Sequence, residues 1–298
     1  MNTVGTDAIV LHVADYLESS RIYRLMTREA GVVSVMARGA RNSRKRFGSG
    51  VDLFAEGQAQ LQLKPGRDLQ SLLSFDVQRS RPQLAADLGV FYGAAAIAEV
   101  TLRLVHEEAA PLVYDHLSAG LTALAATSTP TPTPTQTAAP AVEASGSMAA
   151  GVMASGQKAI AVGSSEQTAI AVGRSDQPAI AVCCSIIWLL ISDIGYRPTL
   201  ANCANCHRPI SPNLTSQFSP QSGGVVCEDC AKSLPRGRSL PPDARAAIAR
   251  WLDGDPVSGL SLPALRAHQR LLREFIAPHL PDSRPLKAYL TWESFTAS

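Results

Sequence analysis

The sequence has few charged residues, and the charges it has nearly cancel. Asp, Glu, Lys and Arg make up 17% of the 298 residues, and 27 basic residues face 25 acidic ones, which leaves a formal charge of +2. A balance this close to neutral excludes any argument from global charge. If the chain binds a charged partner, the attraction must come from local clusters of side chains.

Membrane and secretory signals are also missing. The longest apolar run, Ala179 to Ile191, is shorter than the roughly 20 residues that a membrane-spanning helix needs, so it predicts a buried helix. The first ten residues contain neither a charged n-region nor an apolar h-region. We therefore expect a soluble intracellular protein without a membrane partner.

Motifs of the common enzyme classes do not occur. The sequence has no GxxxxGK[ST] loop, no GxSxG, no HExxH and no dinucleotide-binding fingerprint. His106-Glu107 matches only half of a zinc deaminase signature, because Asn202 stands where that signature has the proline before its CxxC pair. These absences favour a binding protein over an enzyme.

Four of the six cysteines form two CxxC pairs. The pairs are Cys203 with Cys206 and Cys227 with Cys230. Two such pairs on tight turns can supply four thiolates to one tetrahedral zinc and close the site to substrate, so the predicted zinc is structural. Two disulfides or four free thiols are the alternative. The other two cysteines, at 183 and 184, lie in the apolar run and predict core packing rather than a redox pair.

The first 80 residues read as a small β-barrel. Short segments that are apolar or alternate between polar and apolar residues follow one another with turn signals between them. These candidate strands are Ala8 to Val13, Arg21 to Met26, Val32 to Ala37, Val51 to Phe54, Gln58 to Leu63 and Leu69 to Val77. Five or so short strands in so few residues suggest a barrel of the OB type over residues 1–80.

A basic cluster follows one of these strands and contains no acid. Its cations are Arg38, Arg41, Arg44, Lys45 and Arg46. OB barrels bind single strands with basic grooves and stacking aromatic residues, so the cluster predicts a DNA-binding loop. Nearby aromatic residues are Tyr16, Tyr23, Phe47 and Phe54. A solvated basic loop without a ligand is the alternative.

Helical periodicity replaces the strand pattern at Pro82. Apolar residues recur at steps of three and four and predict one face of a long helix. They are Leu84, Leu88, Phe91, Ala95, Ala98, Leu102 and Val105. A second helix is expected to open at Pro111 and to bury Leu117, Leu121 and Leu124. The first part of a helical domain is thus predicted over residues 81–126.

Residues 127–180 interrupt this domain. They are rich in Thr, Pro, Ala, Ser and Gly and include near-identical copies of Ala-Ile-Ala-Val. We expect a low-complexity, disordered insertion here; a small solenoid is the alternative. The last copy is expected to merge into the helix that follows.

The helical domain is predicted to continue on both sides of the zinc module. It resumes over residues 181–200, gives way to the zinc module at 201–235 and ends with C-terminal helices over 236–298. One of these helices should open at Pro241-Pro242 and another should be capped by Ser261. The fold class predicted is α+β: an N-terminal OB-type β-barrel followed by an α-helical domain with an inserted four-cysteine zinc module.

Several short motifs, in this order, resemble the RecO family of bacterial DNA repair proteins. Five segments resemble family motifs: Tyr16-Leu-Glu-Ser-Ser-Arg21, Thr27-Arg-Glu-Ala-Gly31, Ala37-Arg-Gly-Ala-Arg41, Gly195-Tyr-Arg-Pro-Thr-Leu200 and Arg284-Pro-Leu-Lys287. The last is followed by Ala288 where the family usually has Ser. The resemblance covers nearly the whole chain except about 127–180.

The resemblance implies recombination mediation without enzymatic activity. It implies binding of single- and double-stranded DNA, annealing of complementary strands, and work with RecR to load RecA in the bacterial cytoplasm, at the nucleoid. It also implies binding of the acidic C-terminal tail of single-strand-binding protein, in an apolar groove with Arg284 or Lys287 at its mouth. The alternative is a zinc-ribbon scaffold or regulatory protein that binds RNA or a protein partner.

Overall fold

The computed structural model describes residues 2–40, 43–47, 51–106, 108–128, 177–235, 237–282 and 284–297. These residues belong to one compact unit, which is made of Met1–Pro130 and Asp176–Ser298. The predicted insertion lies outside the described residues except at its two ends. Within the described residues, no helix is long and apolar enough to cross a membrane.

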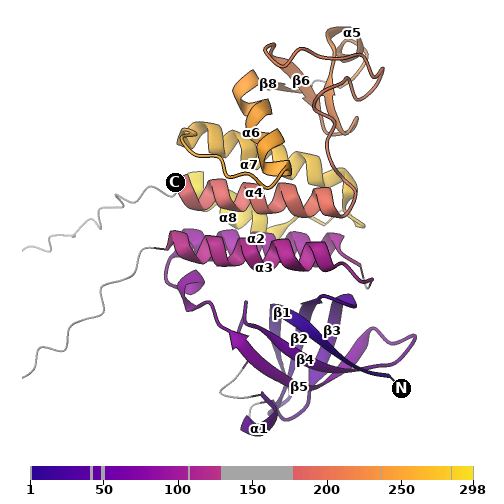
Figure 1. Ribbon diagram of the computed structural model, residues 1–298, viewed down its shortest axis with the longest axis vertical. Helices are drawn as coiled ribbons and strands as arrows, with labels where there is room; N and C mark the ends of the chain where they lie inside the picture. Colours follow the sequence, from indigo (N-terminus) through magenta and orange to yellow (C-terminus); the bar gives the residue numbers. More distant parts are fainter. Residues whose placement is uncertain are drawn as a thin grey trace, which may run out of the picture. The chain divides into compact units, whose positions relative to one another are not determined.

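The N-terminal strands close into a five-stranded barrel in the order β1-β2-β3-β5-β4 (Figure 1). The strands are β1 (Asn2–Tyr16), β2 (Ser20–Thr27), β3 (Gly31–Ala37), β4 (Glu56–Leu63) and β5 (Leu69–Arg79). β1 closes the barrel because its first half pairs with β4 and its second half pairs with β2. β3 and β5 form a parallel pair, and every other pair is antiparallel. The OB-type barrel that the sequence predicts is confirmed.

The prediction of a strand over Val51 to Phe54 is wrong. These residues form a turn in which Phe54 has a positive φ of 64°. Its N–H donates to the carbonyl of Val10 at 2.8 Å, and the N–H of Val10 donates to the carbonyl of Ala55 at 2.9 Å. The turn reverses the chain so that the Phe54 side chain joins the core of the helices, while Val51 stays in the core of the barrel.

The predicted long helix from Pro82 is divided in two. A 3-10 turn, η1 (Pro82–Ala85), precedes α2 (Leu88–Leu104), and the Asp87 side chain caps α2 by accepting from the N–H of Val90 at 3.1 Å. The predicted apolar face is partly right: Leu84, Ala98 and Val105 are buried, but Leu88 is 60% exposed, and the fully buried Ala94 and Ile97 lie outside the predicted set. α2 contacts helices on several sides, so a single apolar stripe does not describe it.

The helices on either side of the insertion share one core. α3 (Pro111–Thr127) packs against α4 (Gln177–Asp193), so helical residues extend a short way into the range predicted for the insertion at both ends. The last Ala-Ile-Ala-Val copy, which starts at Ala179, lies in α4 as expected. Cys183 and Cys184 are fully buried in this core, which confirms the packing role predicted for them.

The described residues of the C-terminal part form a small sheet, four α-helices and a 3-10 turn. Its elements are β6 (Ser216–Ser219), β7 (Gly224–Val226), α5 (Glu228–Ala231), β8 (Arg238–Leu240), α6 (Pro242–Leu252), α7 (Leu262–Ile276), the 3-10 turn η2 (Ala277–His279) and α8 (Lys287–Ala297). The sheet order is β7-β6-β8. The Ser261 hydroxyl caps α7 by accepting from the N–H of Ala264 at 3.4 Å, as predicted.

Candidate functional site

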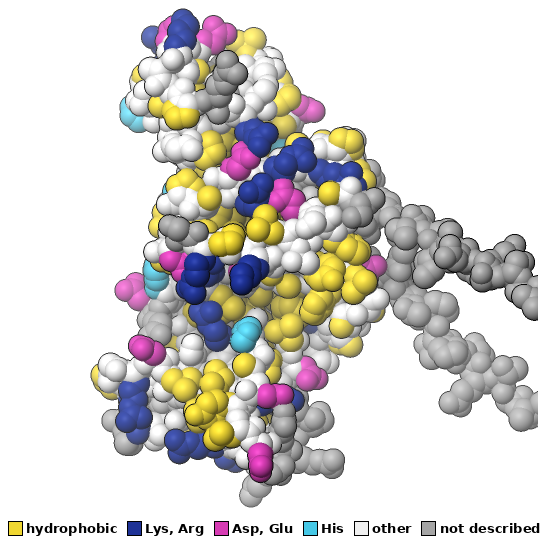
Figure 2. Space-filling model, turned by 180° about the vertical axis from the view of Figure 1, so that it is seen from behind, with side chains coloured by type: hydrophobic (Ala, Val, Ile, Leu, Met, Phe, Trp, Pro, Cys, Tyr) yellow, Lys and Arg dark blue, Asp and Glu magenta, His cyan; other side chains and the backbone are white. Residues whose placement is uncertain are grey.

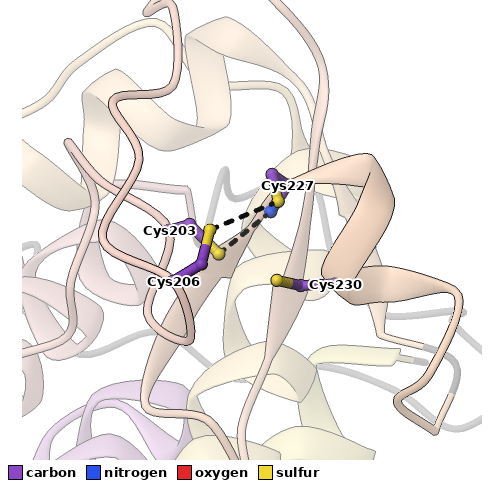
Figure 3. A group of neighbouring side chains, drawn as sticks. All are labelled: Cys203, Cys206, Cys227 and Cys230. Atoms are coloured by element: carbon purple, nitrogen blue, oxygen red, sulfur yellow. Dashed lines mark hydrogen bonds between the residues drawn. The ribbon is translucent and has the colours of Figure 1, made fainter.

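The four cysteines of the CxxC pairs converge on one point (Figure 3). Their Sγ atoms all lie within 4.8 Å of one another, and those of Cys206 and Cys227 are 3.7 Å apart. Zn–S bonds of about 2.3 Å at tetrahedral angles place sulfur atoms about 3.8 Å apart. The cluster can therefore hold one metal ion with four sulfur ligands.

Two backbone features bring the pairs together. The first pair lies on a tight turn: the N–H of Cys203 donates to the carbonyl of Arg208 at 2.8 Å, and the N–H of His207, whose φ is 61°, donates to the carbonyl of Cys203 at 2.9 Å. The second pair lies where β7 passes into α5, with Cys227 as the residue before the helix. The Ala204 N–H donates to the carbonyl of Val225 at 2.7 Å and joins the two turns.

The cluster favours at least one thiolate. Burial opposes ionisation of Cys203, but backbone N–H groups of Cys206, Cys227 and Asn205 stabilise the anion and lower the pKa of Cys203 to about 6. The Cys227 N–H lies 3.4 Å from the Cys203 sulfur. Backbone donors to ligand sulfurs are the kind of outer support that metal-bound thiolates receive.

The basic loop begins where β3 ends, and only part of it is described. Arg38 follows β3 and is exposed. The guanidinium of Arg46 is held against the barrel: it donates to the carbonyl of Leu73 at 2.7 Å and to those of Arg38 and Leu72, each at 3.3 Å. Arg41 lies outside the described residues, as do the side chains of Arg44 and Lys45.

A second cation joins Arg38, and the sequence reasoning missed it. Arg67 is exposed in the turn between β4 and β5 and, with Arg38, lines a hollow of about 410 Å³ on the barrel. Gln70 braces this turn, because its side chain accepts from the N–H of Lys64 at 2.7 Å and donates to the carbonyl of Arg67 at 2.6 Å. The turn Lys64-Pro-Gly-Arg67 contains two cations and could have indicated this second basic position from the sequence.

An apolar hairpin tip lies at the same end of the barrel as Arg38. Arg21 at the start of β2 pairs with Ala37 at the end of β3, so the β1–β2 turn adjoins the basic loop. Tyr16 is 42% exposed and Leu17 is 77% exposed in this turn. Of the four aromatic residues considered for stacking, Tyr16 alone is exposed; the others, Tyr23, Phe47 and Phe54, are core residues.

The residues suggested for the mouth of a partner groove lie at the start of α8. Arg284 is exposed and its side chain pairs with Asp282, with Nε and Oδ2 2.6 Å apart. Lys287 is also exposed, and its backbone N–H donates to the Glu99 carboxylate of α2 at 2.8 Å. Neither residue lines the large apolar hollow of the helical region.

An apolar hollow of about 560 Å³ lies elsewhere in the helical region. It is lined by residues of α3 and α4, by Trp251 of α6, by Gly254 and residues 256–260, and by Leu265 of α7. None of its lining residues is Lys or Arg; the titratable one is His116, whose Nδ1 lies 2.7 Å from an Asp193 carboxylate oxygen.

The fold and the cluster together define an α+β protein that joins an OB-type barrel to a helical region carrying a four-cysteine module. Two family models match this chain: recombination protein O N terminal over residues 1–81 and recombination protein O C terminal over residues 175–288. The chain belongs to the recombination protein O family, and the resemblance seen in the short motifs is confirmed.

Curated relatives named DNA repair protein RecO support this assignment. That of Anaeromyxobacter dehalogenans is 30% identical over 289 residues, which cover 94% of this chain and 92% of the relative. That of Symbiobacterium thermophilum is 26% identical over 291 residues, or 97% of this chain and 92% of the relative. That of Syntrophotalea carbinolica is 40% identical over 123 residues, or 41% of this chain and 48% of the relative.

Proposed function

We propose that this chain is a non-enzymatic recombination mediator. It binds single- and double-stranded DNA, anneals complementary single strands, and helps to load RecA onto DNA coated with single-strand-binding protein. Its partners are single-strand-binding protein, RecR and, indirectly, RecA, at the bacterial nucleoid. Membership of the recombination protein O family supports this proposal at the level of DNA repair.

The observation that carries the DNA-binding proposal is the surface around Arg38. Arg38 and Arg67 line one hollow, and the exposed Tyr16 lies at the adjoining hairpin tip. Cations neutralise phosphates, and an exposed aromatic ring can stack on a base. We assign Arg41, Arg44 and Lys45 to the same surface from their place in the loop. Arg46 instead positions the loop, because its donors are engaged by main-chain carbonyls.

We propose zinc as the metal of the cysteine cluster. Four sulfur ligands at tetrahedral spacing favour zinc over metals that prefer oxygen. With Cys203, Cys206, Cys227 and Cys230 as ligands, the zinc would be fully coordinated and structural. His207 is exposed and stands outside the group of close ligand atoms.

We propose that the acidic C-terminal tail of single-strand-binding protein binds with its apolar end in the hollow beside Trp251. The hollow can bury an apolar side chain, and the cation for the acidic residues must come from outside its lining. Arg284 and Lys287 stay candidates for that cation. A tail peptide should lose affinity when Ala123→Glu places an acid in the lining.

The test of the proposed function is annealing of complementary strands coated with the cognate single-strand-binding protein. Wild type is compared with Arg38→Ala/Arg41→Ala/Arg67→Ala and with Lys232→Ala, a control that removes an exposed cation away from both proposed surfaces. We expect fast annealing by wild type and the control, and loss in the triple variant. If wild type does not anneal, the mediator proposal is wrong; if the triple variant anneals normally, the DNA surface is elsewhere.

A further inference from the structure

The exposed side of α7 carries a line of arginines that the proposed function does not use. Arg266, Arg270 and Arg273 are spaced at four and three residues, so they lie along one side of the helix. With a rise of 1.5 Å per residue the line is about 10 Å long. Figure 2, turned to the side on which α7 faces the viewer, shows Lys and Arg side chains gathered with a few Asp or Glu among them.

Two acidic residues on this surface already form ion pairs with arginines. Glu293 of α8 binds Arg273, with Oε2 2.7 Å from Nε. The Glu274 carboxylate of α7 accepts hydrogen bonds from Nε and Nη2 of Arg238 on β8, with Oε2 2.8 Å from Nε. Each acid is thus matched by one arginine, so the surface keeps an excess of positive charge.

That excess resides on Arg266 and Arg270. Within the part of the chain that the structure describes, neither side chain has an ion pair within 4 Å, although Arg270 lies near enough to Glu274 to help Arg238 lower the pKa of that carboxyl. Arg270 is exposed, whereas the Nε of Arg266 is shut off from solvent and has no hydrogen-bond acceptor among the described residues. Because this Nε is closed to solvent, it is also closed to a phosphate oxygen, so a phosphate would be bound by the exposed Arg270 guanidinium and by the terminal N–H groups of Arg266.

The arginine line offers positive charge but no apolar hollow, and this difference indicates which kind of partner it can bind. None of these arginines lines the apolar hollow, and Arg270 lies about 140° around the helix from Leu265, which does line it. An acidic peptide that ends in apolar side chains would need both features together. A phosphate backbone needs only the cations, and about 10 Å corresponds to about three steps of 3.4 Å along one DNA strand.

We infer that the arginine line of α7, Arg266, Arg270 and Arg273 with Arg238 beside it, is a second DNA-binding surface that holds the backbone of another strand. The inference rests on the proposed function, in which the barrel surface around Arg38 holds the first strand. Two basic surfaces on one protein can hold two strands with their bases free, which lowers the repulsion between them. Annealing then follows from holding both strands at once.

The first experiment measures binding of a labelled thirty-nucleotide oligothymidylate to the full chain as a function of salt. We compare wild type, Arg266→Ala/Arg270→Ala, the conservative Arg266→Lys/Arg270→Lys, the control Lys232→Ala, and the barrel variant Arg38→Ala/Arg67→Ala. Each phosphate contact on a single strand contributes about 0.7 to the slope of log K against log salt. The α7 alanine variant should lose about 1.4 from that slope, the lysine variant should lose little, and the control should match wild type.

The second experiment asks whether two strands bind together. Two oligothymidylates that carry donor and acceptor dyes cannot pair, so energy transfer between them reports joint binding to the protein. Wild type should give transfer, and either the α7 or the barrel alanine variant should lose it. Circular dichroism of each variant confirms that the fold is intact.

The outcomes separate the two proposals. If the barrel variant loses slope but the α7 variant keeps the wild-type slope and energy transfer, the second surface is refuted and the proposed function stands. If wild type shows no salt-dependent DNA binding, the proposed function itself fails. If the α7 variant loses only its affinity for a polyglutamate peptide, the surface serves an acidic protein and the inference is overturned.

Discussion

At the scale of the residue, the basic loop contains arginines with two different tasks. Arg38 projects into solvent, whereas the Arg46 guanidinium is engaged by three main-chain carbonyls and also lies over the Phe47 ring at 4.8 Å. The cluster of like charges in the sequence therefore divides into side chains that can meet a phosphate and one that holds the loop to β5.

This division predicts opposite behaviour of two variants. Arg46→Ala should lower the free energy of unfolding by about 1–2 kcal/mol, because several hydrogen bonds from a charged group are lost. Arg38→Ala should leave stability within about 0.5 kcal/mol of wild type and weaken DNA binding. Urea denaturation and oligonucleotide anisotropy measure the two effects; equal stability of both variants would contradict the assignment.

At the scale of the element, the turn between β2 and β3 explains why the motif Thr27-Arg-Glu-Ala-Gly31 begins with threonine and ends with glycine. The Thr27 hydroxyl donates to the carbonyl of Gly31 at 2.9 Å and accepts from the N–H of Ala30 at 3.1 Å. Gly31 has a φ of 62°, and a Cβ on it would lie 2.1 Å from the carbonyl oxygen of His106. The turn therefore needs both the hydroxyl and the glycine in order to meet the segment after α2.

Gly31→Ala should be strongly destabilising. The left-handed backbone costs about 1–2 kcal/mol for a residue with a Cβ, and the clash with a backbone carbonyl adds to that cost, so we expect a loss of about 2 kcal/mol or more. Gly39→Ala is the matched control, because Gly39 has a φ of 68° and no atom within 4 Å of an added Cβ. Thermal unfolding of both variants compares them, and equal losses would show that the close approach to His106 carries no cost.

Removal of one cysteine ligand should unfold the cysteine module locally and leave the barrel folded. Cys227→Ser should abolish stoichiometric zinc and unfold the region of β6, β7 and α5, because zinc binding contributes about 10 kcal/mol or more to the folding of such sites. The barrel should stay folded, since its core residues are separate from the module. Metal analysis and amide hydrogen exchange report the two regions independently. A zinc-free wild type with a protected module would disprove the zinc assignment.

At the scale of the whole molecule, a buried ion pair joins the barrel to the helices. Arg81, just before η1, pairs with Glu56 of β4 and donates to the carbonyl of Phe54 at 3.0 Å and to the hydroxyl of Ser118 on α3 at 3.2 Å. Burial opposes ionisation of Glu56, but the Ser118 hydroxyl and Arg81 outweigh it and lower the pKa of Glu56. Breaking a buried pair leaves an unpaired buried charge, which is costly.

Because the pKa of Glu56 is lower in the folded state, its carboxylate stabilises the protein above the unfolded value of about 4.3 and loses this effect as the pH falls through the folded value. The free energy of unfolding should therefore drop with pH in that range. Glu56→Gln should be less stable at neutral pH by about 3 kcal/mol and should show a shallower drop in acid. Chemical denaturation between pH 3 and pH 7 measures both; parallel curves for variant and wild type would refute the role of Glu56.

Local patterns predicted the elements whose environment is simple. Strand alternation identified the barrel, because each of its strands has one side in a core, and the CxxC spacing identified the cysteine cluster, because ligand spacing is a local property. The same reasoning held only in part for α2, which is surrounded by other helices, and failed for Val51 to Phe54, where apolar residues serve two different cores. A local pattern cannot report which core a side chain enters.

Short motifs in the chain were enough to predict the family, the barrel, the helical region and the four cysteines of the cluster, since each motif is made of residues close together in sequence. The neighbours of each cation, by contrast, are visible only in the folded chain. The tertiary structure engaged the Arg46 guanidinium with main-chain carbonyls, placed Arg67 beside Arg38 on one hollow, and matched Glu274 and Glu293 with Arg238 and Arg273 rather than with Arg266 or Arg270. The physical reason is that the availability of a charge depends on its spatial neighbours, which come from distant parts of the chain.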